Sequence, residues 1–291
     1  MSERLRVDEP TPLLRFLEAH LGGWSRKAVK ERLRLGCVQV NGVATTKHDH
    51  PLGPGDEVLV RAKGDAAAPR VAPAGFTTLH EDDDLIAIDK PAGLLSVATD
   101  KEADRTALAM VRDSMTGPRA RQRVKLWPVH RLDRETSGVL LLARSREMCK
   151  ALQRSWSSAD KEYLAVVSGH PSPPEGAIDQ PLWEDPSLNV RVGGGPGSRD
   201  ARTRFRTRIT GPERALLEVR TDTGRRHQIR VHLAHIGHPI VGDKRYGRPG
   251  TGSRLGLHAL RLEVTDPRTG ERLGIEAPPD AKLLALVRRE S

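Results

Sequence analysis

The sequence predicts an α+β protein, with a small N-terminal domain of helices and a short sheet followed by a larger domain around a largely buried sheet. Short apolar runs dominate from Phe76 onward, and we expect strands at 85–89, 138–143, 162–169, 215–220 and 229–237. Segments 106–115 and 146–156 have the composition of helices that pack on such a sheet. A chain of 291 residues exceeds the usual size of one domain, so a second, smaller domain is expected.

The N-terminal elements follow one another closely. Leucines and a phenylalanine recur at helical spacing from Leu13 to Leu21, and Ser25 is a suitable N-cap for a second helix that ends near Gly36. This second helix is strongly basic and includes Arg26, Lys27 and Lys30, and for a single charged helix a solvated face is the commoner explanation. The stretch "CVQVNGVAT" then alternates apolar and polar residues around Asn41-Gly42, the strongest short signal for a hairpin.

A composition change separates the two domains. Residues 61–75, "RAKGDAAAPRVAPAG", are rich in alanine, proline and glycine and poor in large apolar residues. We therefore expect a first domain at 1–62, a linker at 63–75 and a second domain at 76–291.

Charge and composition restrict the class of protein. The formal net charge is +10 and the pI is near 10.0, which favours an anionic partner, with nucleic acid first and an anionic membrane surface second. Only 3% of residues are aromatic, which argues against a surface made mainly of base-stacking platforms. The absence of an apolar signal core and of a membrane span, together with only two cysteines, leads us to expect a cytoplasmic protein that does not bind a membrane.

The stretch "WPVHRLDRETSGVLLLARS", residues 127–145, places one carboxylate, Asp133, between Arg131 and Arg134. Neighbouring positive charge favours the ionised form of a carboxylate, which suits a nucleophile better than a general acid. For an arbitrary cluster of this kind, a buried ion pair that positions a turn is the commoner explanation. Ser137 lacks the Gly-x-Ser-x-Gly turn of a hydrolase, and the late histidines alternate with arginines that would repel a metal ion. No metal site is expected.

The stretch "HRLDRETSGVLLLA" closely resembles the signature of the RluA-type pseudouridine synthases. Three further stretches match in the expected order: "DLIAIDKPAGLLSV", "KEYLAVVSG" and "TGRRHQIRVHLAHIGHPIVGDKRYG". Together they span nearly all of residues 76–265, and they depart from the family pattern at Glu135, at Arg226 and at Ser96-Val97. The resemblance implies a mixed, largely antiparallel sheet. The N-terminal segment from Ser25 to Val60 resembles the S-four-type RNA-binding domain, which binds structured RNA. The resemblance implies that Arg26, Lys27 and Lys30 contact RNA.

The resemblance implies that uridine in RNA is isomerised to pseudouridine without a cofactor or metal. Asp133 matches the family's nucleophile. Its carboxylate could attack either the uracil ring or the ribose. Arg230 matches the arginine that pairs with this aspartate, and Tyr163 matches the tyrosine that stacks on uracil and offers a hydroxyl for proton transfer. Two further matching residues are expected at the base: Leu257 lines it, and Arg131 fills the place that it leaves. Lys90, His130 and Arg225 are expected either to support the site or to bind RNA.

A further feature follows from periodicity alone. In "ARTRFRTRI" every second residue is an arginine, so a strand here would have one wholly cationic face made of Arg202, Arg204, Arg206 and Arg208. Such a face could simply be solvated. Because four adjacent like charges repel one another, we favour a track for the RNA backbone.

Two other functions stay open. A non-catalytic RNA-binding or ribosome-assembly protein could keep the same fold, although it would be expected to lose the aspartate motif. A uracil-directed glycosylase also uses an acid near a flipped base, although none of the long motifs indicates one. As partner we expect structured RNA, with ribosomal RNA favoured over transfer RNA, and we expect a monomer.

Overall fold

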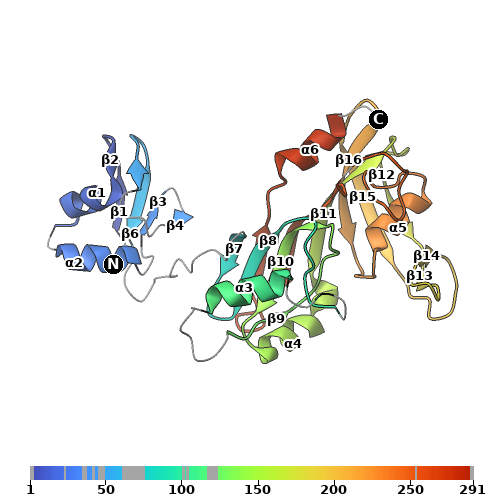
Figure 1. Ribbon diagram of the computed structural model, residues 1–291, viewed down its shortest axis with the longest axis horizontal. Coiled ribbons are helices and arrows are strands. Elements are labelled where there is room, and N and C mark those ends of the chain that lie inside the picture. Colours follow the sequence, from blue (N-terminus) through green and yellow to red (C-terminus); the bar gives the residue numbers. More distant parts are fainter. Residues whose placement is uncertain are drawn as a thin grey trace. The chain divides into compact units, whose positions relative to one another are not determined.

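A computed structural model of the protein describes residues 3–22, 24–34, 38–40, 43–44, 50–60, 76–99, 102, 105–116, 124–252 and 254–288. The chain divides into two compact units, Met1–Ala72 and Pro73–Ser291. The first unit contains the basic helix, and the second contains the large sheet (Figure 1).

The first unit packs two helices against a small antiparallel sheet. Its described elements are β1 (Glu3–Arg6), β2 (Thr11–Pro12), α1 (Leu13–His20), α2 (Arg26–Arg34), β3 (Val38–Val40), β4 (Val43–Ala44), β5 (Pro51–Leu52) and β6 (Glu57–Val60). The sheet has the order β1-β6-β3-β4. Phe16 and Leu17 of α1 and Val29 and Leu33 of α2 pack in one apolar cluster with the valines of β3 and β6, because their spacing places them on one helical face.

The expected N-cap of α2 is confirmed, since the amide of Ala28 donates to Oγ of Ser25 at 3.2 Å. Three other expectations for this region lie outside the described residues: the helix stop at Gly36, the turn at Asn41-Gly42 and the linker at 63–75.

The second unit is organised around one twisted sheet. Its strands are β7 (Thr77–Glu81), β8 (Leu85–Lys90), β9 (Trp127–Pro128), β10 (Ser137–Ala143), β11 (Asp160–Ser168), β12 (Glu175–Asp179), β15 (Arg202–Thr210), β16 (Arg214–Thr221), β17 (Leu257–Thr265) and β18 (Arg272–Glu276), with a separate hairpin of β13 (Leu182–Glu184) and β14 (Val190–Val192). The main path runs β12-β15-β16-β11-β17-β10-β8-β7, and β18 and β9 pair with β17 and β10. The β10–β17 pair is parallel and the other described pairs are antiparallel. The predicted α+β class with a mixed, largely antiparallel sheet is therefore confirmed.

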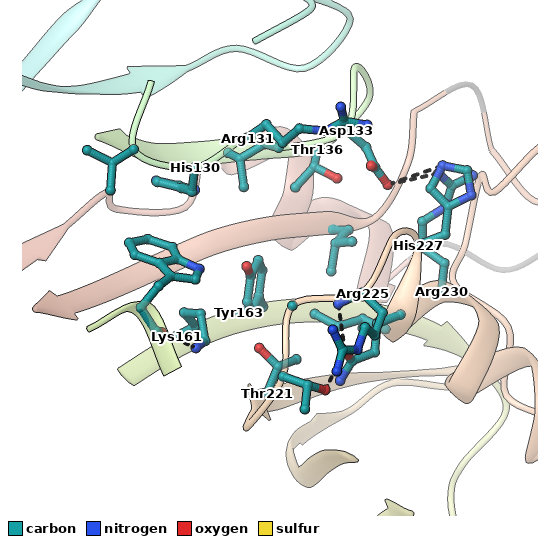
Figure 2. Close-up of a pocket in the computed structure, with 18 residues that line it drawn as sticks. His130, Arg131, Asp133, Thr136, Lys161, Tyr163, Thr221, Arg225, His227 and Arg230 are labelled. Atoms are coloured by element: carbon teal, nitrogen blue, oxygen red, sulfur yellow. Dashed lines mark hydrogen bonds and ion pairs between the residues drawn. The ribbon is translucent and has the colours of Figure 1, made fainter. Parts of the chain in front are cut away.

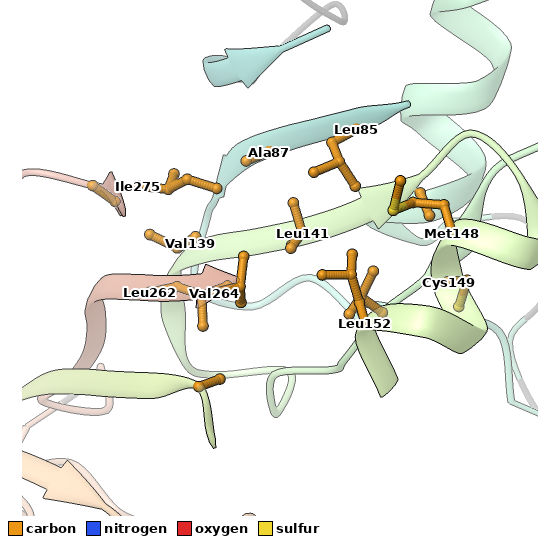
Figure 3. Packing of buried hydrophobic residues seen from close by; sticks show 14 residues of the cluster. Leu85, Ala87, Val139, Leu141, Met148, Cys149, Leu152, Leu262, Val264 and Ile275 are labelled. Carbon is orange, nitrogen blue, oxygen red and sulfur yellow. The ribbon is translucent and has the colours of Figure 1, made fainter. Parts of the chain in front are cut away.

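One half of the sheet is buried on both faces. Alternate residues of β8 and β10, such as Leu85 and Leu141, pack with α4 (Arg146–Arg154), whose Met148 and Leu152 reach them (Figure 3). The intervening residues, such as Leu140, pack with α3 (Ala107–Met115) on the opposite side. Because both faces are covered, these strands have the continuous apolar runs that the sequence shows instead of an alternating pattern.

The other half of the sheet is covered by α5 (Gln228–His235) and α6 (Ala281–Arg288). Ile229 and Leu233 of α5 pack with one face of β11 and β16, and Leu283 of α6 packs with the other. The strand expected at 229–237 is wrong, since most of this segment is the helix α5. Its apolar residues alternate with polar ones that are also buried, namely Gln228, Arg230 and His232, so the pattern has the period of a strand while the backbone is helical.

The parallel pair β10–β17 brings the Asp133 loop to the middle of the sheet. Its register aligns Gly138 with Ala259, and the antiparallel β11–β17 pair aligns Tyr163 with the same Ala259. Gly138 has a φ of +110°, and a Cβ there would lie 2.1 Å from the carbonyl oxygen of Ala259, so only glycine fits this entry into the strand. The register also shifts between Glu162 and Tyr163, an irregularity of the kind that redirects a side chain.

Candidate active site

Three segments that are far apart in sequence surround a cleft of about 870 Å³ (Figure 2). They are the loop before β10, the start of β11, and the turn from β16 into the first turn of α5. The cleft is lined by seven of the residues expected from the sequence: Asp133, Tyr163, Arg230, Arg131, His130, Arg225 and Leu257. The fold thus gathers most of the expected site residues in one place.

The peptide groups on both sides of Asp133 are held by side chains from the β8 region. Oγ of Ser96 donates to the carbonyl of Leu132 at 2.8 Å and accepts from the amide of Leu132 at 3.0 Å. Nζ of Lys90 donates to the carbonyl of Arg134 at 3.1 Å. The carboxylate between these two fixed peptides keeps a side-chain exposure of 27% and can be reached from the cleft.

Lys90 itself cannot be reached by RNA in this conformation. Its exposed fraction is 0%, and its ammonium also donates to the carbonyls of Pro91 at 2.9 Å and Leu94 at 2.8 Å. Burial lowers its pKa to about 8. Of the two roles expected for Lys90, these contacts favour support of the loop that carries Asp133 over contact with RNA.

Arg230 connects Asp133 to a second, buried carboxylate. Its Nη1 donates to Oδ2 of Asp133 at 3.1 Å, while Nε and Nη2 both donate to Asp243 at 2.8 Å. Burial alone would raise the pKa of Asp243, but the hydrogen bonds and charge of Arg230 and the amides of Arg245 and Tyr246 lower it overall. Burial alone would lower the pKa of Arg230, but the hydrogen bonds and negative charges of Asp243 and Asp133 raise it overall. The guanidinium is therefore a fixed cation that orients Asp133.

His227 approaches Asp133 from the turn before α5. Its Nε2 lies 3.8 Å from Oδ2 of Asp133, and its Nδ1 lies 2.8 Å from the hydroxyl of Tyr246. That hydroxyl accepts from the amide of Val190 at 3.3 Å, so its own hydrogen is free to be donated to Nδ1. In the tautomer with its hydrogen on Nδ1, a lone pair of Nε2 would point at a carboxylate oxygen of Asp133, which is unfavourable. The network therefore assigns the hydrogen to Nε2, where it faces Asp133.

His227 is held in its neutral form and in a restricted backbone conformation. Burial lowers its pKa to about 4, although the charge of Asp133 opposes this shift. Its φ of +52° lies in the left-handed region, which is uncommon for residues other than glycine and often marks a functional site. The neutral imidazole therefore presents an N–H toward the carboxylate, at a distance longer than a hydrogen bond.

Tyr163 and Leu257 line the part of the cleft that faces Asp133 across the sheet. Burial raises the pKa of Tyr163 to about 12, and the negative charge of Asp133 adds to this effect. The phenol is therefore protonated at neutral pH. Leu257, with an exposed fraction of 4%, gives the cleft an apolar patch and also belongs to the cluster under α5.

His130 forms part of the wall. Its Nε2 accepts from the amide of Leu141 at 3.1 Å, and its ring stacks on Trp156 with 4.8 Å between centroids. Burial lowers its pKa to about 4, in agreement with a neutral ring that accepts at Nε2.

Two arginines at the cleft remain accessible to a ligand. The guanidinium of Arg131 is exposed and makes no hydrogen bond or ion pair within the described residues. Nε of Arg225 donates to the carbonyl of Asp200 at 3.1 Å. Both side chains can therefore offer further N–H groups to an anion.

The arginines of β15 lie outside this cleft, and their face is not wholly cationic. Arg202 and Arg204 pair with Asp222, at 3.8 and 2.5 Å, and Arg206 and Arg208 pair with Glu218. The expectation of a wholly cationic face is therefore wrong, because two acids on and just after β16 compensate part of its charge.

Contact of the β15 arginines with RNA stays a prediction. Contact of the basic residues of α2 with RNA also stays a prediction. Arg26, Lys27 and Lys30 are exposed, and Arg26 pairs with Glu18 at 2.9 Å.

Three residues that shape the site were missed by the sequence analysis: His227, Asp243 and Tyr246. All of them lie within the stretch "TGRRHQIRVHLAHIGHPIVGDKRYG", which was matched as a whole. Their contacts with Arg230 and Asp133 depend on how α5 and the following turn fold back, and that path cannot be deduced from spacing.

Within the described ranges, no group of three or more histidines, cysteines and acids is close enough to hold a metal ion. The described helices include none that is long and apolar enough to cross a membrane.

Comparison with known proteins agrees with the geometry. Residues 84–235 match the family described as RNA pseudouridylate synthase. An uncharacterized RNA pseudouridine synthase of Mycobacterium bovis is 36% identical, over 96% of this chain and 92% of its own length. Ribosomal large subunit pseudouridine synthase D of Nitrosomonas europaea is 34% identical, over 98% of this chain and 85% of its own.

Dual-specificity RNA pseudouridine synthase RluA of Escherichia coli is 36% identical, over 69% of this chain and 92% of its own length. The solved structure of human RNA pseudouridylate synthase domain containing 4 shares the fold, with a TM-score of 0.60, 23% identity, and coverage of 72% of this chain and 91% of that chain. The chain therefore belongs to the RNA pseudouridine synthase family, as an RluA-type member, and is an isomerase that acts on RNA.

Proposed function

We propose that Asp133 is the nucleophile that isomerises a uridine of structured RNA in this cleft, without a cofactor. The observation that carries the assignment is the position of Asp133 between two fixed peptides, with its carboxylate oriented by Arg230 and faced by neutral His227. A nucleophile needs a charged group that is accessible and held in one direction, and Asp133 meets these requirements.

The reaction breaks the bond from N1 of uracil to C1′ of ribose and makes a new bond from C5 to C1′. In this proposal Asp133 attacks the substrate, the detached base turns while it stays in the cleft, and C5 then bonds to C1′. The hydrogen on C5 must leave and N1 must gain one, so no atoms are lost overall. The phenol of Tyr163, which is protonated at neutral pH, takes part in proton transfer at the base, and its ring stacks on the uracil together with Leu257.

The target uridine must leave its stack to reach Asp133, which costs a few kcal/mol. Arg131 supports this step in our proposal, because its planar guanidinium is exposed beside the cleft and can replace stacking and hydrogen bonding in the vacated place. His130 supports the wall and Arg225 binds an RNA phosphate.

We favour ribosomal RNA over transfer RNA as substrate. The relative named as a ribosomal large subunit synthase matches 98% of this chain, including the first unit, whereas the relative named as dual-specificity matches 69%. The first unit is proposed to be an S-four-type domain that uses Arg26, Lys27 and Lys30 on α2 to hold structured RNA. The enzyme is proposed to act as a monomer in the cytoplasm.

A groove of about 910 Å³ supports a path for RNA across the sheet toward β15. It shares Lys161 and Thr221 with the cleft. Its lining holds three arginines that pair with acids of the same groove: Arg204 with Asp222, Arg220 with Glu162 and Arg261 with Glu263. The β15 arginines keep exposed fractions of 49–54% despite their ion pairs. The pairs of Arg202 and Arg204 with exposed Asp222 contribute only about 0–1 kcal/mol, so phosphates can compete for these two guanidinium groups. Arg206 and Arg208 share the buried Glu218 and keep their outer N–H groups at the surface.

The direct test is to incubate the purified protein with ribosomal RNA and, separately, transfer RNA from cells that lack it, and then to map pseudouridines. We expect pseudouridine at a defined uridine of ribosomal RNA and no free uracil. Free uracil would indicate a glycosylase instead, and RNA binding without any base change would indicate a non-catalytic RNA-binding protein.

A further inference from the structure

A second cleft, of about 750 Å³, adjoins the candidate active site. Its lining includes Trp183 and Glu184 of β13, Arg199 from the loop before β15, and Arg226 from the turn before α5. It shares Gly224 and Arg225 with the cleft that contains Asp133. A ligand that extends out of the active site along this turn would therefore enter the second cleft.

Trp183 differs from the other aromatic residues of the chain. Eight of the nine aromatic side chains pack with an apolar cluster: Phe16, Trp24, Phe76, Trp127, Trp156, Tyr163, Phe205 and Tyr246. Trp183 belongs to none of these clusters and is only half-buried. A large ring at a cleft that contributes to no core is typical of a surface that binds a flat ligand.

The hairpin holds Trp183 in place from one side. Trp183 pairs with Arg191 across β13 and β14, and Gly195 packs directly on the ring, since a Cβ at Gly195 would lie 2.3 Å from the indole. The indole N–H makes no hydrogen bond within the described part of the chain. The ring is therefore supported without being enclosed, and its polar edge is free for a ligand.

The charge of this cleft is positive. Glu184 pairs with Arg226, which leaves Arg199 and Arg225 as the uncompensated charges of the lining. The guanidinium of Arg199 has no partner within the described residues, and Arg225 uses only Nε for the carbonyl of Asp200. An aromatic ring next to free guanidinium groups matches the chemistry of one nucleotide, with the ring for its base and the cations for its phosphate.

We propose that this cleft binds the nucleotide next to the target uridine, with its base stacked on Trp183 and its phosphate at Arg199 and Arg225. We call it the flanking subsite. The proposal rests on the proposed function, because it takes the occupant of the first cleft to be a uridine of RNA. It makes Trp183 a residue that positions the RNA at the active site, whichever base stacks on the ring.

The test uses a short synthetic RNA hairpin with the converted uridine, and two versions that lack the base on its 5′ or its 3′ side. Trp183→Ala should weaken binding of the intact hairpin by about 10- to 100-fold, the range expected for the loss of one stacked base. The loss should appear mainly in KM. On one of the two hairpins that lack a flanking base, Trp183→Ala should cause no further loss, because the stacking partner is already absent.

Three further variants keep the result interpretable. Trp183→Phe retains a ring and should lose less affinity than Trp183→Ala, which separates stacking from a local folding defect. Leu188→Ala changes an exposed side chain on the same hairpin and should bind like the wild type. Arg199→Gln should flatten the slope of log affinity against log salt by about 0.7, the value for one phosphate contact on single-stranded RNA.

Equal losses for Trp183→Ala on all three hairpins, or no loss on any, would overturn the flanking subsite. A peptide or another ligand would then be the occupant to seek. Binding is measured separately from turnover, so a wild-type protein that binds the hairpin but makes no pseudouridine would disprove the proposed function without affecting the stacking result.

Discussion

At the residue scale, the site is organised around the direction of one carboxylate. Ser96 and Lys90 fix the peptides on either side of Asp133, and Arg230 and His227 approach its Oδ2. The cation that touches Asp133 is itself fixed by Asp243, which is buried. Because each contact is held by another group, little reorganisation is needed when a substrate arrives.

Tyr163→Phe separates packing from proton transfer. The ring remains and RNA affinity should stay close to that of the wild type, while product formation should fall sharply because the protonated hydroxyl is lost. Single-turnover rates at saturating RNA measure this effect. A Phe variant with full activity would leave Tyr163 with a packing role only.

Tyr246→Phe examines the assignment of the His227 tautomer. The ring beside Arg230 remains, but the hydroxyl that donates to Nδ1 is lost, so the hydrogen on Nε2 is no longer specified. We expect kcat to fall about fivefold, equivalent to about 1 kcal/mol for one hydrogen bond, while RNA affinity is kept. Tyr246→Leu, which also removes the ring, should lose more. If the Phe variant matches the wild type in kcat, the hydroxyl has no role in orienting His227.

At the element scale, α5 explains why part of the sequence was misread. Arg230 contacts Asp133 and Asp243, and His232 contacts Thr203 at 2.9 Å, so these polar residues are buried where a helix on a sheet would ordinarily be apolar. The resulting alternation has the period of a strand. In this helix, polar residues with specific contacts occupy buried positions that would otherwise be apolar, so the hydrophobic pattern does not indicate a helix.

Strand β15 was predicted correctly from its alternation, but its electrostatics were not. The acids that compensate its arginines, Glu218 and Asp222, lie on and just after β16, and only the pairing of β15 with β16 brings them together. Local periodicity specifies which face a residue occupies and does not specify the neighbour across the sheet.

The proposed RNA path over β15 is tested by replacing Arg204 and Arg206 together with glutamine. If both touch phosphates, affinity should fall and the slope of log affinity against log salt should flatten by about 1.4. Arg146→Gln, on the exposed start of α4, is the control for loss of a positive charge elsewhere. An unchanged slope in the double variant would mean that these arginines serve only their ion pairs.

At the scale of the whole molecule, the motifs predicted more than the periodicity did. The long matching stretches identified Asp133, Tyr163 and Arg230, and the fold brings all three to one cleft. The same stretches contained Ser96, flagged only as a departure from the family, which holds the Leu132 peptide. Contacts between segments about 100 positions apart, such as Arg230 with Asp133, depend on the sheet order, which composition and spacing do not determine.

The two units lead to a prediction about the whole chain. Each unit has its own apolar clusters, so removal of residues 1–72 should leave a folded protein that still isomerises uridine. Binding to structured RNA should weaken and its salt dependence should become shallower, because the charges of α2 are lost. Thermal unfolding and salt titrations measure both effects. Failure of the truncated protein to fold would show that the second unit depends on the first.

The most direct measurement of the central claim is the single-turnover rate of Asp133→Asn on the RNA that the wild type converts. Asparagine has a similar size and can occupy the same loop, but an amide cannot act as the nucleophile. We predict loss of pseudouridine formation, with RNA affinity and thermal stability near those of the wild type. Turnover within about tenfold of the wild type would contradict the account, because catalysis would then not depend on the Asp133 carboxylate.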